Sequence, residues 1–88
     1  MHSGLSPKYP HLLQQGWVEF RPPQGEEGLY HITRNSGGTQ VEVLRKHDGA
    51  YKAYEFPVQV AESASDEELA IILFENDEVT WQDYRGNL

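Results

Sequence analysis

The sequence predicts an α+β domain with a four-stranded antiparallel meander, a C-terminal helix packed on one face of the sheet, and a short N-terminal helix. Apolar and polar residues alternate through several segments between positions 17 and 60, as in half-buried strands. Asp48-Gly49 separates two such runs, which is typical of a hairpin. Ser65 and Glu68 form a capping box directly before the apolar run 69–74. The 88 residues suffice for a single domain, 1–88.

The individual elements follow from local signals along the chain. Pro10 can begin a short helix over 11–15, and Gly16 can end it. Strands are predicted at 17–20, 29–34, 39–46 and 50–60, with Pro57 placing part of the last strand at an edge or a bulge. Short connections between consecutive strands favour an antiparallel meander.

The segment after Ser65 is predicted to be a helix, and the capping box decides this. Asp66 and Glu67 add negative charge where the helix dipole is positive. The residues predicted to share the buried helix face are Leu69, Ile72, Leu73 and Asn76, with Ala70 and Phe74 beside them. The alternative is a buried strand at 69–74, which would make the chain a small all-β barrel. Residues 79–81 can add a short final strand.

The two faces of the sheet are predicted to differ. The residues predicted to line the inner face are Val18, Phe20, Tyr30, Ile32, Val41, Val43, Tyr54, Phe56, Val58 and Val60. Trp17, Leu29, Leu44 and Tyr51 lie out of phase with that set and form an aromatic outer face, which can be a recognition surface. Alternatively, Leu12 and Leu13 of the N-terminal helix cover this face. A bare face would favour a homodimer.

Charge is distributed unevenly along the chain. Residues 1–52 carry six basic and five acidic side chains, whereas residues 53–88 carry one basic and nine acidic side chains. The net charge of −7 argues against direct nucleic-acid binding, which depends on Lys and Arg, and is compatible with a basic protein partner. The charges otherwise serve to keep a small domain in solution.

Several kinds of site are excluded or weakly supported. The chain has no cysteine, which rules out disulfides, thiolate metal sites and a cysteine nucleophile, and favours the cytoplasm. No membrane span or signal peptide is expected, because the longest apolar run has only six residues and no basic patch precedes an apolar segment. No metal site, cofactor site or catalytic set is predicted, since the four histidines lack ligand spacing and Ser36-Gly37-Gly38 lacks the P-loop lysine.

The sequence therefore favours a small, non-catalytic protein-interaction or regulatory module. The residues predicted to bind the partner are Trp17, Leu44 and Tyr51 on the outer sheet face and Asp66, Glu67, Glu75, Asp77 and Glu78 around the C-terminal helix. A second hypothesis is an acidic mimic that binds a nucleic-acid protein; direct nucleic-acid binding would use Arg34, Arg45, Lys46 and Lys52. A third is a small enzyme with His31 or His47 as its base.

Overall fold

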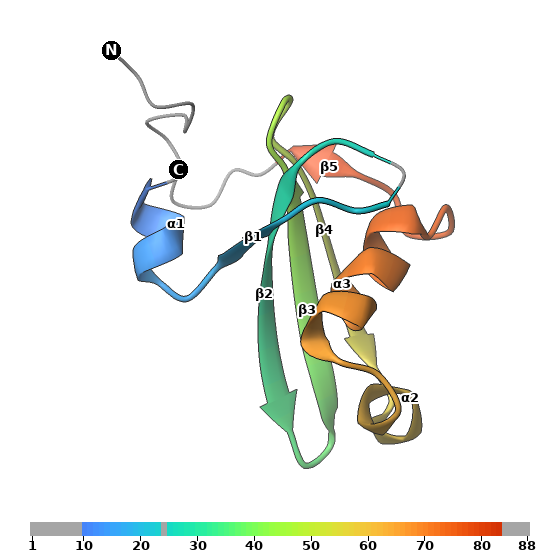
Figure 1. Ribbon diagram of the computed structural model, residues 1–88. Helices are drawn as coiled ribbons and strands as arrows, with labels where there is room; N and C mark the ends of the chain where they lie inside the picture. The colour runs from blue at the N-terminus through green and yellow to red at the C-terminus, as the bar shows by residue number, and fades with distance from the viewer. Residues whose placement is uncertain (1–9, 24, 84–88) are drawn as a thin grey trace.

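A computed structural model describes residues 10–23 and 25–83, and it has the predicted α+β architecture. The elements in order are α1 (Pro10–Gln14), β1 (Val18–Phe20), β2 (Gly28–Asn35), β3 (Gly38–Arg45), β4 (Ala50–Phe56), α2 (Val58–Glu62), α3 (Asp66–Glu75) and β5 (Gln82–Asp83). The strands form one antiparallel sheet in the order β1-β2-β3-β4-β5. Helix α1 lies on one side of it, and α2 and α3 lie on the other (Figure 1). The sheet is open, so the alternative of a closed barrel is wrong.

The hairpin between β3 and β4 forms where Asp48-Gly49 predicted it. The Asp48 carboxylate accepts a hydrogen bond from the backbone N–H of Ala50 at 3.0 Å, and it pairs with both Nε and Nη2 of Arg45. Gly49 has a φ of 74°, a backbone conformation that glycine adopts without strain. These contacts set the register in which Leu44 lies opposite Tyr51.

The fourth strand is shorter than predicted, and the assignment of Val58 and Val60 to it is wrong. The strand ends at Phe56, and residues 58–62 form the helix α2. Pro57 is extended and has no N–H to continue the ladder, while its carbonyl accepts from the N–H of Ala61 at 3.0 Å. Pro57 therefore separates strand from helix, rather than marking an edge or a bulge within one strand.

The main core lies between the sheet and α3. The buried residues that form it are Phe20, Val41, Val43, Phe56, Ala61, Leu69, Ala70, Leu73 and Phe74. The capping box is confirmed: Ser65 Oγ accepts from Glu68 N at 3.2 Å, and Glu68 Oε1 accepts from Ser65 N at 2.8 Å. The predicted helix face is displaced, however, because Ile72 is 44% exposed while Ala70 and Phe74 are buried.

Lys52 holds a place on the inner face that the alternation pattern did not predict. It lies opposite Val43 and is only 1% exposed. Tyr54 and Val18 were predicted to be buried on this face, but both side chains are exposed. The final strand occupies Gln82–Asp83 rather than 79–81, and Trp81 packs its ring edge-on against Phe74 in the core.

A second, smaller cluster lies on the outer face under α1. It consists of Leu12, Trp17, Leu29 and Leu44, with Leu13 and Tyr51 packed against it. The alternative in which the N-terminal helix covers this face is therefore confirmed. In the part of the chain that the structure describes, no helix is long and apolar enough to cross a bilayer.

Candidate functional site

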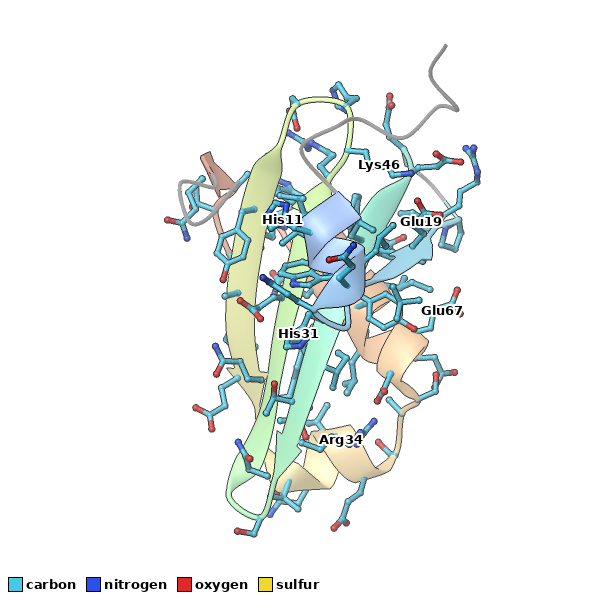
Figure 2. The ribbon with its side chains drawn as sticks, turned by 90° about the vertical axis from the view of Figure 1, so that its left-hand side faces the viewer. His11, Glu19, His31, Arg34, Lys46 and Glu67 are labelled. Carbon is cyan, nitrogen blue, oxygen red and sulfur yellow. The ribbon has the colours of Figure 1, made fainter. Side chains whose placement is uncertain are left out.

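The aromatic outer face is largely enclosed within the fold. Trp17 and Leu44 are buried beneath α1, and Tyr51 is half-buried with its hydroxyl donating to Glu42 at 2.8 Å. Figure 2 looks onto this side of the molecule and shows α1 in front of the strands. The three residues thus lie together, as the alternation predicted, but they are packing partners of α1 rather than a bare surface.

His31 belongs to a polar cluster beside this covered face. Its Nδ1 lies 3.0 Å from Oε1 of Glu42, the carboxylate that also accepts from Tyr51, and its ring stacks on that of Trp17 at 5.5 Å between centroids. In general-base catalysis a histidine accepts the proton, and a neighbouring carboxylate can hold its ring in the required orientation. Three surface hollows within residues 10–23 and 25–83 are lined by residues other than His31.

His47 lies elsewhere, at the exposed hairpin between β3 and β4. Its ring nitrogens are 3.6 Å from Glu26 and 3.8 Å from Asp48. It borders a hollow of about 590 Å³ with Gly25, Glu26, Arg45, Phe74, Glu75 and Trp81. Arg45 lies over the Trp81 ring at 4.4 Å and is paired with Asp48, so the cationic group of this hollow is already engaged.

The basic residues that direct nucleic-acid binding would need are all engaged inside the chain. Arg34 pairs with Asp66, Arg45 with Asp48, and Lys46 with Glu19 and Glu27. Lys52 is buried, and its ammonium bonds to backbone carbonyls at the end of α3. The four cations do not gather into one exposed patch.

An apolar groove lies between α2 and α3, on the side of the sheet away from α1. It has a volume of about 420 Å³ and is lined by Val60, Ser63, Ala64, Glu68, Ile71 and Ile72. Val60 on α2 is 39% exposed and Ile72 on α3 is 44% exposed, so two large aliphatic side chains face water here. The sequence had placed both of them in the core.

Arg34 of β2 fixes the two walls of this groove relative to each other. Its guanidinium donates to the carbonyls of Ala61 and Ala64, at 3.0 Å and 3.1 Å, and to Oδ1 of Asp66 at 2.8 Å. One side chain thereby ties the end of α2, the connecting residues and the first turn of α3 to the sheet. In Figure 2, Arg34 lies beside the lower helix, where these segments meet. The groove is therefore preorganised.

The five acidic residues predicted to bind a partner lie outside the groove lining, whose acidic residue, Glu68, was not among them. Glu67 and Glu75 are exposed on α3, and Glu68 lines the groove itself. Asp66 is the partner of Arg34, and Asp77 and Glu78 are exposed in the turn after α3. Burial raises the pKa of the Tyr30 phenol, and the nearby charges of Glu67 and Asp66 raise it further.

The carboxylates bracket the exposed isoleucines at helical spacing. Glu68 lies one turn before Ile71 and Ile72, and Glu75 lies one turn after them, on the same side of α3. Glu67 is turned away from Ile72 by about 140° around the helix axis. The groove lining is mostly apolar and contains one carboxylate, Glu68, and Glu75 follows one turn beyond Ile71 and Ile72. Arg34, which contacts both walls, is paired with Asp66. We call Glu68 and Glu75 the acidic rim.

Comparison of this chain with protein-family models, with curated proteins and with solved structures gives no match.

Proposed function

We propose that this chain is a non-catalytic protein-binding module, and that the groove between α2 and α3 is its binding surface. The observation that carries the proposal is the exposure of Ile72 and Val60 on the two walls of one groove. A partner that covered them would gain roughly 25 cal/mol for each Å² of apolar surface removed from water. The groove can therefore bind apolar side chains of a partner protein.

The acidic rim indicates the charge of the partner. Exposed carboxylates at both ends of the groove attract Lys and Arg and repel acidic chains, which sets orientation and speeds association. A second copy of this chain is a poor occupant, because each copy carries a net charge of −7. The partner that fits is a basic protein segment with apolar anchors.

The proposal moves the apolar part of the binding surface away from the outer sheet face. Trp17 and Leu44 are used to hold α1, whereas Glu67 and Glu75 remain available to a partner. Asp77 and Glu78 lie beyond the end of α3 and extend the negative surface there. Binding should weaken as salt rises, because exposed charges are screened within about 8–10 Å.

A peptide-display selection tests the proposal. Random peptides are selected on the immobilised chain, and the enriched peptides are titrated by calorimetry against the wild type and against I72S. The matched control is V18S, because Val18 is an equally exposed aliphatic residue, at 46%, on β1. We expect I72S to lower affinity at least tenfold and V18S to change it less than twofold. Peptides that bind all three proteins equally would overturn the proposal.

A further inference from the structure

The spacing of the acidic rim gives information on the shape of the partner, provided that the proposed function is right. Glu68 lies in the first turn of α3, and Glu75 is its last residue. Seven residues of α-helix at 1.5 Å per residue place the two ends of the rim about 10.5 Å apart along the helix axis. Ile71 and Ile72 lie midway between them.

The backbone of the groove walls offers little for an extended peptide to bind. The walls are helical, so most of their N–H and C=O groups already bond within α2 and α3, and neither wall provides a free strand edge. The carbonyls of Ala61 and Ala64 bond to Arg34, and that of Val60 accepts from Ser63. An extended segment would lose water from backbone groups that gain no partner, whereas a helix bonds its own backbone.

We infer that the groove binds a short amphipathic helix that carries two cations about two turns apart, with apolar residues between them on the same face. Cations at positions i and i+7 of such a helix are about 10.5 Å apart, which matches the separation of the rim. Apolar residues at i+3 and i+4 then lie on the same side, opposite Ile72 and Val60. The pattern is Lys/Arg-x-x-apolar-apolar-x-x-Lys/Arg.

Synthetic peptides test this inference directly. The probe is a blocked 15-residue, Ala- and Gln-based peptide with Lys at i and i+7 and Leu at i+3 and i+4. Its isomer has the same composition and moves both Lys residues to the face opposite the leucines, and circular dichroism checks that the two have equal helix content. We expect the probe to bind at least tenfold more tightly than the isomer, as measured by fluorescence anisotropy in low salt.

A charge swap tests the contact at the end of the rim. E75K should weaken binding of the probe about tenfold, and replacing one terminal Lys of the probe by Glu should restore most of that loss. The matched control is E55K, because Glu55 is an exposed carboxylate on β4 and the change in net charge is the same. It should change affinity less than twofold.

The outcomes separate this inference from the function on which it rests. If probe and isomer bind equally, and I72S abolishes both, the groove binds proteins but the inferred pattern is wrong. If neither peptide binds while display-selected extended peptides do so in an I72S-sensitive way, the helical occupant is likewise wrong. If the probe binds and I72S does not affect it, both the inference and the proposed function fail.

Discussion

Lys52 on β4 donates from its ammonium to the carbonyl of Asn76, at 2.6 Å, and so joins the sheet to the end of α3. The same Nζ donates to the carbonyl of Leu73 at 3.1 Å and lies over the Trp81 ring at 4.5 Å. A cation is favourable at a helix C-terminus, where free carbonyls and the helix dipole are negative. This buried contact orients the helix that forms one wall of the groove.

Replacement of Lys52 by Met tests the contribution of that contact to stability. Methionine approximately retains the volume but leaves the carbonyls of α3 without the donor, so we expect K52M to lower the free energy of unfolding by about 1–3 kcal/mol. Urea unfolding followed by circular dichroism measures it. R21M is the control, because Arg21 forms an exposed pair with Glu27 and should contribute less than about 1 kcal/mol. Equal effects of the two changes would contradict the assignment.

Arg34 provides a second test, of the preorganised groove. R34M removes the donors to Ala61, Ala64 and Asp66 together, whereas D66N removes the charge of the ion pair and keeps Arg34 on the two carbonyls. We expect R34M to cost about 1–3 kcal/mol and D66N less than about 1 kcal/mol. Amide hydrogen exchange should show faster opening at residues 61–66 in R34M. Unchanged exchange there would show that Arg34 does not hold the two helices together.

The ion pair of Asp48 with Arg45 should make the stability of the fold depend on pH. The hydrogen bonds from Arg45 lower the pKa of its carboxyl from 3.8 to about 2. The unfolded chain therefore binds the proton more tightly, and the stabilisation that is complete above about pH 4 is lost as the pH falls towards 2. Thermal unfolding of the wild type and D48N should give Tm values that converge over this range. A constant difference between them would contradict the role of this carboxyl.

Leu12 tests how firmly α1 covers the outer face. Its side chain is fully buried against Trp17, Leu29 and Leu44, so L12A should cost about 2–4 kcal/mol. In a W81F background the emission of Trp17 should shift to the red as its ring meets water. The half-buried Leu13 serves as the control, and L13A should cost less. An unshifted Trp17 spectrum in L12A would mean that α1 is not what shields this ring.

The sequence predicted best those parts of the fold that depend on local chemistry. The capping box at Ser65 and the turn at Asp48-Gly49 involve bonds between residues at most three positions apart, and both formed as expected. The prediction that the fourth strand continues past Pro57 was wrong because Val58 and Val60 continue the alternation of β4. Periodicity over three residues does not distinguish a strand from the first turn of a helix.

The candidate site was only half predictable, because burial depends on partners that are far away in the sequence. Glu67 and Glu75 could be assigned to the exposed surface from their charge alone. Ile72 and Val60 could not, because an isoleucine or valine in an apolar run is ordinarily assigned to the core. Lys52 is the opposite case: a charged residue is ordinarily assigned to the surface, and its buried acceptors come from the end of α3, more than 20 residues away.

Amide chemical-shift mapping tests the central claim most directly. The isotope-labelled chain is titrated with the synthetic helix that carries Lys at i and i+7 and Leu at i+3 and i+4. The account predicts that the largest shifts map to residues 60–75, with Val60, Ala64, Ile71 and Ile72 at their centre, and that these shifts diminish in high salt. Shifts centred instead on Leu44 and Tyr51, beneath α1, would contradict it and would return the binding surface to the outer face of the sheet.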